Sequence, residues 1–187
     1  MNLTKLFETQ RILDARIEKE HPKVEGEDRL AKKILALQVE IGECANEWRG
    51  FKFWSNDQKP RSEVKHYARG SGKSIPHYVV SNPLLEEYVD CLHFILSIGL
   101  NLDLKIKAME ELIIFDSRPS RDTVFVFSKL FHSISSMNYT EEIEGHYYNG
   151  FQWFVELGHK LGFTWEQIEK AYCDKNEINH TRQDTGY

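Results

Sequence analysis

Two pairs of acidic residues have a spacing that could bind a metal ion. Glu40 and Glu43 form an E-x-x-E pair, and Glu87 and Asp90 form an E-x-x-D pair. Residues three apart lie on the same face of an α-helix, so each pair would present two carboxylates to one side. If the two helices pack side by side, four carboxylates meet and form the oxygen cage that magnesium or manganese prefers. A site of this kind suits phosphate chemistry.

The second acidic pair is stronger evidence for a functional site than the first. Glu87 and Asp90 lie in residues 83–100, which are apolar nearly all round and therefore predict a buried helix. Acidic side chains on such a helix are costly unless they are paired or bind a metal. Glu40 and Glu43 alone would be interpreted as a solvent-exposed face. The spacing also fits a di-iron carboxylate protein, but those sites use a Glu-x-x-His pair that this helix lacks.

Two further groups of polar residues could bind a nucleotide. Lys175, Asn179 and Arg182 share a face of the predicted C-terminal helix, together with Tyr172. Lys and Arg suit a polyphosphate, and an Asn amide can match the edge of a pyrimidine. Gln10 falls on the apolar stripe of the first helix, where a polar side chain needs a partner.

The elements that must position these residues are mostly helical. The periodicity predicts an all-α helical bundle in one domain, residues 1–187, with helices over residues 3–20, 28–50, 83–100, 101–115, 123–137, 146–161 and from 164 onward. The second helix has an apolar seam of Ile34, Leu37, Ile41, Cys44 and Trp48, and Thr164 with Gln167 fits a capping box that opens the last helix. Residues 55–83 show no sustained period and predict a long loop with a hairpin near residues 77–80. Residues 57–77 carry five basic and two acidic side chains, a net +3. Residues 69–74 resemble part of a phosphate-binding P-loop, but the first glycine of that motif is missing.

The composition excludes several classes of protein. The net charge of −5 disfavours a nucleic-acid polymer as the main partner. No apolar run approaches the length of a membrane span, and no signal peptide is evident, so we expect a cytoplasmic protein that does not engage a membrane. The three cysteines have neither metal-finger spacing nor a disulfide pattern.

Three segments together resemble the dimeric all-α dUTPases, most closely the branch of Gram-positive bacteria and their phages. They are LQVEIGECANEWRGFKFW (37–54), LLEEYVDCLHF (84–94) and KNEINHTRQDTGY (175–187). No single motif is specific, but their joint pattern is. The wider group contains the MazG-like all-α nucleotide pyrophosphatases. The resemblance implies a homodimer that hydrolyses dUTP to dUMP and pyrophosphate with magnesium.

The resemblance also implies a role for individual residues. By position, the metal would be held by Glu40, Glu43, Glu87 and Asp90, and Glu43 would also activate water. The uracil would be read by Gln10 and Asn179, and the phosphates would be held by Lys175 and Arg182. The nucleotide site would also be lined by Lys52 and Trp54, from either subunit. Two alternatives stay open. The substrate could be another nucleotide such as dCTP, or the protein could sense nucleotides and bind a regulatory protein through residues 57–77.

Overall fold

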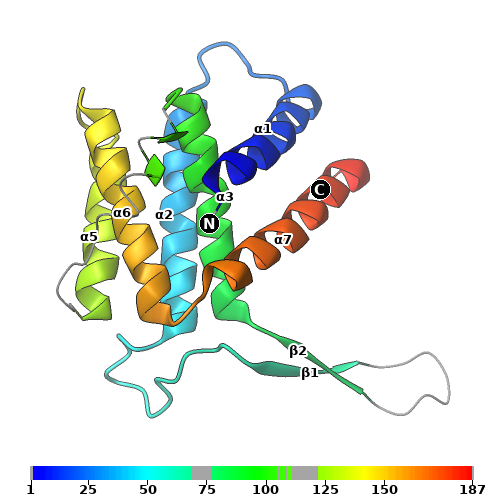
Figure 1. Ribbon diagram of the computed structural model, residues 1–187, viewed down its shortest axis with the longest axis vertical. Helices are drawn as coiled ribbons and strands as arrows, with labels where there is room; N and C mark the ends of the chain where they lie inside the picture. Colours follow the sequence, from blue (N-terminus) through cyan, green and yellow to red (C-terminus); the bar gives the residue numbers. More distant parts are fainter. Residues whose placement is uncertain (1, 69–76, 105, 108, 111–121, 187) are drawn as a thin grey trace.

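The chain folds into a bundle of α-helices with one small β-hairpin (Figure 1). The computed structural model describes residues 2–68, 77–104, 106–107, 109–110 and 122–186. Its elements, in chain order, are α1 (Leu3–Glu20), α2 (Arg29–Trp48), β1 (Val64–Ala68), β2 (His77–Ser81), α3 (Pro83–Asn101), α5 (Thr123–Ser136), α6 (Ile143–Leu161) and α7 (Trp165–Thr185). The predicted all-α class is therefore confirmed.

The labelled helices other than α6 start at residues whose side chains accept a capping hydrogen bond. The side chains of Asp28 and Asn82 accept hydrogen bonds from the backbone three residues on, at the starts of α2 and α3. Thr164 and Gln167 form the capping box expected for the last helix, with both reciprocal hydrogen bonds present. These caps satisfy backbone N–H groups that the first turn leaves without a partner.

Helices α2 and α3 form the centre of the bundle and run antiparallel (Figure 1). Helices α1 and α7 pack on one side of α3, and α5 and α6 cover the other side of the central pair. Of the predicted seam of α2, Ile34, Leu37, Ile41 and Cys44 are at most 1% exposed, and Trp48 is partly buried. Burial of this seam against α3 brings the two acidic pairs to the same junction.

Helix α3 ends at Asn101, close to the predicted end at residue 100. Asp103 takes a positive φ of 51° in the turn that follows. Residues 106–107 and 109–110 are helical again, within the range predicted as the next helix. The predicted continuation is interrupted, since residues 102–104 form a turn and not a helix, and residues 105, 108 and 111–115 of the predicted helix lie outside the described residues.

The predicted long loop contains the hairpin β1–β2. The two strands pair antiparallel, with Val64 opposite Ser81 and His66 opposite Val79. The Tyr67 and Tyr78 rings meet edge to face, 5.4 Å apart between centroids, on one side of this hairpin. The hairpin leaves the bundle at the start of α3 and extends away from it (Figure 1). The P-loop-like segment 69–74 lies outside the described residues.

Helix α2 ends before the predicted Gly50. Arg49 takes a left-handed conformation with a φ of 63°, and its guanidinium donates to the Asp57 carbonyl at 2.7 Å. This turn starts the irregular segment that leads to the hairpin. Within the described part of the chain, no helix is long and apolar enough to cross a membrane.

Candidate active site

Three of the four predicted carboxylates meet where α2 packs against α3. Glu40, Glu87 and Asp90 each offer a carboxylate oxygen, and these oxygens lie within 4.8 Å of one another. All three side chains are half-buried. We call these three residues the carboxylate cluster. Its donors are oxygens only, which is the ligand set of a hard divalent cation and differs from the Glu-His set of a di-iron site.

Glu43 lies outside the carboxylate cluster. It sits one turn after Glu40 on α2 and is exposed. Its charge nevertheless acts on the cluster, since it contributes to the raised pKa of both Glu40 and Glu87. The structure therefore places Glu43 beside the cluster, on the solvent side.

The electrostatics of the carboxylate cluster are unfavourable without a cation. Burial and the neighbouring carboxylates, Asp90 first among them, raise the pKa of Glu40 and of Glu87 from 4.5 to about 7. Lys175 opposes this rise, because its Nζ donates to Asp90 Oδ2 at 2.6 Å. One ammonium group compensates part of the charge, and protons supply the rest near neutral pH.

The carboxylate cluster opens into a cleft of about 580 Å³. Helices α1, α2, α3 and α7 all contribute side chains to its wall. The predicted site residues among them are Gln10, Glu40, Asp90, Asn179 and Arg182. The structure therefore brings the predicted base-reading residues and part of the metal site to one cleft.

Gln10 is fixed inside this cleft by a network of hydrogen bonds. Its Nε2 donates to Asp14 Oδ1 at 2.7 Å, and its Oε1 accepts from the Tyr172 hydroxyl at 2.8 Å. Ser97 Oγ donates to Asp14 Oδ2 at 2.5 Å. We call Gln10, Asp14, Ser97 and Tyr172 the Gln10 network. Gln10 is 3% exposed, and these bonds provide the partners that a buried amide needs.

Asn179 and Arg182 lie one turn apart on α7. The Arg182 guanidinium donates to Asn179 Oδ1 at 3.3 Å. Arg182 also acts on the carboxylate cluster, where its charge lowers the pKa of Glu40. The two side chains thus connect the carboxylate cluster with the wall of the cleft.

Lys52 and Trp54 lie away from this cleft. Lys52 Nζ is hydrogen-bonded to Asn46 Oδ1, and the Trp54 ring contacts the rings of Phe51 and Phe53. Trp54 is 65% exposed. Neither residue is part of the cleft wall among the described residues, so the structure does not bring them together with the other predicted site residues.

Several polar residues of the cleft were not predicted from the sequence. Asp14, Ser97, His93 and Lys33 all line it. Spacing offered a hint for Asp14, one turn after Gln10, and for Ser97, on the polar arc of α3. Lys33 Nζ lies 3.4 Å from Asp14 Oδ2, a pairing between α1 and α2 that no local pattern reveals.

His93 is buried beside the Gln10 network. Its ring stacks on Tyr172 with 4.2 Å between centroids, and its Nδ1 is hydrogen-bonded to the Val89 carbonyl at 2.9 Å. Burial lowers the pKa of this imidazole. A neutral ring donating through Nδ1 leaves Nε2 as an acceptor, and that atom has no partner among the described residues.

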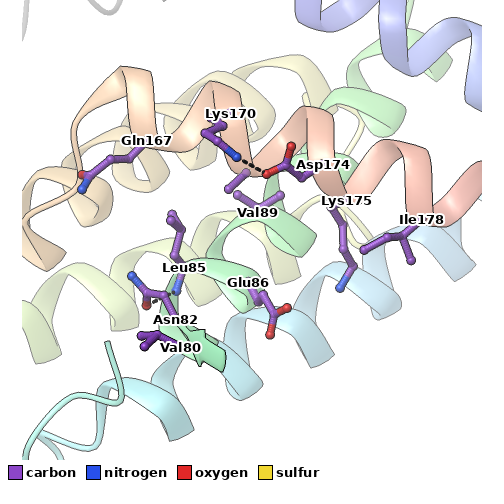
Figure 2. A pocket seen from close by; sticks show the side chains of 11 residues that line it. Val80, Asn82, Leu85, Glu86, Val89, Gln167, Lys170, Asp174, Lys175 and Ile178 are labelled. Atoms are coloured by element: carbon purple, nitrogen blue, oxygen red, sulfur yellow. Dashed lines mark hydrogen bonds and ion pairs between the residues drawn. The ribbon is translucent and has the colours of Figure 1, made fainter. Parts of the chain in front are cut away.

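A second cleft of about 400 Å³ lies between the start of α3 and α7 (Figure 2). Val80, Leu85, Val89 and Ile178 form its apolar wall. Figure 2 shows the Lys170–Asp174 ion pair at one edge of this cleft. Lys175 also lines it, while its Nζ reaches Asp90 in the carboxylate cluster. The second cleft therefore adjoins the carboxylate cluster.

One of two comparisons with known proteins gives a match. A family model described as dUTPase matches residues 2–67 and 77–187. A comparison with curated proteins gives no match. The family match includes both acidic pairs, Gln10 and the polar face of α7. The chain therefore belongs to the dUTPase family, and it is a dUTP diphosphatase.

Proposed function

We propose that the chain hydrolyses dUTP to dUMP and pyrophosphate at a magnesium site formed by Glu40, Glu43, Glu87 and Asp90. The observation that carries this proposal is the convergence of three carboxylates within 4.8 Å, two of which, those of Glu40 and Asp90, line the main cleft. Family membership supports the substrate and the reaction.

The residues present fit a divalent cation. Glu40 and Glu87 have a raised pKa because like charges lie close together in a partly buried place, and a bound cation relieves this repulsion. Magnesium, or manganese in its place, would neutralise phosphate charge and lower the pKa of a water molecule at this site. Glu40, Glu87 and Asp90 would be its ligands, with Glu43 beside them.

Glu43 would orient the attacking water and accept its proton. Its carboxylate is exposed and next to the carboxylate cluster, so it can contact a water molecule that reaches the cluster from solvent. A general base in this position typically contributes a factor of about 10² to 10⁴ in rate. The water oxygen forms a bond to phosphorus, the bond between phosphorus and the bridging oxygen of the leaving group breaks, and the proton of the water passes to Glu43.

The other polar side chains would bind the nucleotide. Lys175 balances Asp90 in the absence of a cation. Once the carboxylates are neutralised, its ammonium can contact phosphate oxygens together with the Arg182 guanidinium. Gln10 and Asn179, on α1 and α7 of the same cleft, would hydrogen-bond the uracil edge.

We infer that the chain acts as a homodimer. Exposed apolar side chains support this, since Phe53 is 84% exposed and Leu35 and Val39, one turn apart on α2, also face solvent. In a dimer, Lys52 and Trp54 of one subunit would complete the nucleotide site of its partner. Trp54→Ala should then lower both activity and the dimer fraction measured by sedimentation.

A second role as a protein-binding module is favoured by the hairpin. Tyr67, Tyr78, Val79 and Val80 are exposed on it, and basic residues predominate in 57–77. An acidic regulatory protein would be the complementary partner. Deleting residues 64–81 should abolish such binding and leave hydrolysis intact.

We place the enzyme in the cytoplasm, where its three free cysteines would stay reduced.

The test of the catalytic proposal is Glu43→Gln. This change keeps the shape of an exposed side chain, so the fold should survive, while release of pyrophosphate from dUTP with magnesium should fall about a hundredfold or more. Glu86→Gln, an exposed change on α3 outside the carboxylate cluster, is the matched control and should keep wild-type turnover. Full activity of Glu43→Gln would refute this mechanism. A panel of dUTP, dCTP and dTTP with and without magnesium separates the substrates.

A further inference from the structure

The amide of Gln10 is held at both ends. On one side Nε2 donates to Asp14 Oδ1 at 2.7 Å, and on the other side Oε1 accepts from the Tyr172 hydroxyl at 2.8 Å. The side chain is 3% exposed, so water cannot easily replace either partner. One N–H and one lone pair of the amide remain for a ligand.

The direction of this amide is set by Asp14 and not by Tyr172. A hydroxyl can donate or accept, so Tyr172 would tolerate either orientation of Gln10. A carboxylate can only accept. If the amide turned over, Gln10 Oε1 would face Asp14 Oδ1, and two acceptors would oppose each other in a buried place.

Asp14 is itself held in place from the other side. Its Oδ2 accepts from Ser97 Oγ at 2.5 Å and lies 3.4 Å from Lys33 Nζ. Both of these groups act as donors toward Oδ2, and Lys33 has no acceptor to offer. Oδ1 is therefore left to Gln10, and the carboxylate has little freedom to rotate.

A fixed amide distinguishes uracil from cytosine. Uracil presents an N3–H donor next to a carbonyl oxygen, whereas cytosine presents an N3 acceptor next to an amino group. If both bases bind in the same pose, the orientation of the Gln10 amide that hydrogen-bonds uracil places donor against donor and acceptor against acceptor with cytosine. From this geometry we propose that Asp14 is a positioning residue that locks the Gln10 amide and makes the cleft select uracil over cytosine. The proposal rests on the proposed function, in which Gln10 reads the base.

Asp14→Asn tests the lock with a side chain of the same shape. Ser97 and Lys33 would keep the Asn oxygen at the Oδ2 position, which directs the Asn NH₂ at Gln10. The Gln10 amide should then turn over to present Oε1 to this new donor. We expect the ratio of kcat/KM for dUTP over that for dCTP to fall on the order of tenfold or more.

Two control variants separate the lock from general damage. Tyr172→Phe removes a hydrogen bond of Gln10 but leaves Asp14 in place, so kcat/KM should fall by a similar factor for both substrates and their ratio should stay within about threefold. Asp184→Asn makes the same chemical change on an exposed carboxylate that pairs with Arg16, and it should leave the ratio unchanged. A thermal melt of each variant checks the fold.

Binding of the products gives a readout without turnover. The dissociation constants of dUMP and dCMP, measured by calorimetry, should move toward each other or cross in Asp14→Asn. A folded Asp14→Asn variant with the wild-type preference in both assays would overturn the lock, as would equal binding of dUMP and dCMP by the wild-type chain. Failure of the wild-type chain to hydrolyse dUTP while it still prefers dUMP would sink the proposed catalytic function and leave the lock standing.

Discussion

The two ends of the main cleft are built in opposite ways. The carboxylate cluster gathers like charges in a partly buried place, with Lys175 as a cationic partner of Asp90. The Gln10 network gathers neutral and charged groups whose hydrogen bonds match one another. The first end has a raised pKa at Glu40 and Glu87, and the second has a buried amide with both ends bonded.

This difference indicates which end depends on a ligand. A satisfied polar network stabilises the fold and is organised before a base arrives, so little energy is spent on ordering it during binding. A cluster of like charges destabilises the fold until a cation neutralises it, which is a usual cost of an active site. Variants at the two ends should therefore respond differently to magnesium and to pH.

The largest effect is expected from Glu87→Gln. Loss of one carboxylate should reduce magnesium-dependent dUTP hydrolysis on the order of a thousandfold, because the metal contributes several kcal/mol to charge stabilisation. In EDTA at pH 8, the same variant should unfold at a higher temperature than the wild-type chain, because a repulsive charge is gone. Turnover assays and thermal melts measure the two changes. Unchanged turnover would show that the carboxylate of Glu87 is not needed for hydrolysis. A lower melting temperature in EDTA would show that the carboxylate cluster does not destabilise the metal-free chain.

The stability of the metal-free chain should fall as pH rises, and magnesium should oppose this fall. The pKa of Glu40 and of Glu87 is about 7 in the folded chain against 4.5 as the ordinary value. Between these pH values the folded chain keeps protons that the unfolded chain has lost, so metal-free stability falls as pH rises through this window. Above about pH 7 this loss is complete.

Denaturant titrations at pH 5, 6, 7 and 8, in EDTA and in magnesium, measure this behaviour. Added magnesium should stabilise the chain more at pH 8 than at pH 5, because protons no longer compete for the carboxylates. The Glu40→Gln and Glu87→Gln variants should each show a weaker dependence. An equal effect of magnesium at pH 5 and pH 8 would count against a metal site at the carboxylate cluster.

At the other end, Tyr172→Phe should lower stability moderately. The ring still stacks on His93, but Gln10 Oε1 loses its donor in a buried place, which costs about 1–3 kcal/mol. Magnesium should not restore this loss. The free energy of unfolding from urea titrations, with and without magnesium, measures it. Recovery of the loss on adding magnesium would mean that the two ends are not independent.

The smallest effect is expected from Ser97→Ala. Asp14 loses one donor but keeps its contacts with Gln10 and Lys33, so unfolding should become easier by only about 0.5–1.5 kcal/mol. The same urea titrations measure this change. A loss larger than that of Tyr172→Phe would show that Ser97, and not the hydroxyl of Tyr172, is the main support of the Gln10 network.

Periodicity predicted most of the fold because helices are local. The seam of α2 and the capping box of α7 lie where spacing placed them. Helix ends were less accurate, since the left-handed conformation of Arg49 that ends α2 depends on its surroundings. Residues 55–83 lack the helical period, and the hairpin predicted near residues 77–80 is present, with β2 over His77–Ser81 pairing with β1.

The candidate site was predictable only in part. Spacing placed each acidic pair on a helix face and identified the polar face of α7. It did not reveal that Glu43 lies outside the carboxylate cluster, because the rotation of α2 against α3 decides which acid faces inward. Nor did it reveal that Tyr172 on α7 bonds Gln10 on α1, or that Ser97 on α3 bonds Asp14.

The sequence by itself determined the chemistry that the chain can offer. It contains two acidic pairs at helical spacing, one of which lies on a helix so apolar that it must be buried, and a polar face near the C-terminus. Tertiary structure decided how these groups combine. Packing of α1, α2 and α7 with α3 forms the cleft, joins Asp14 to Ser97 and Lys33, and joins Gln10 to Tyr172. Contacts between such distant segments depend on how helices pack and not on local spacing.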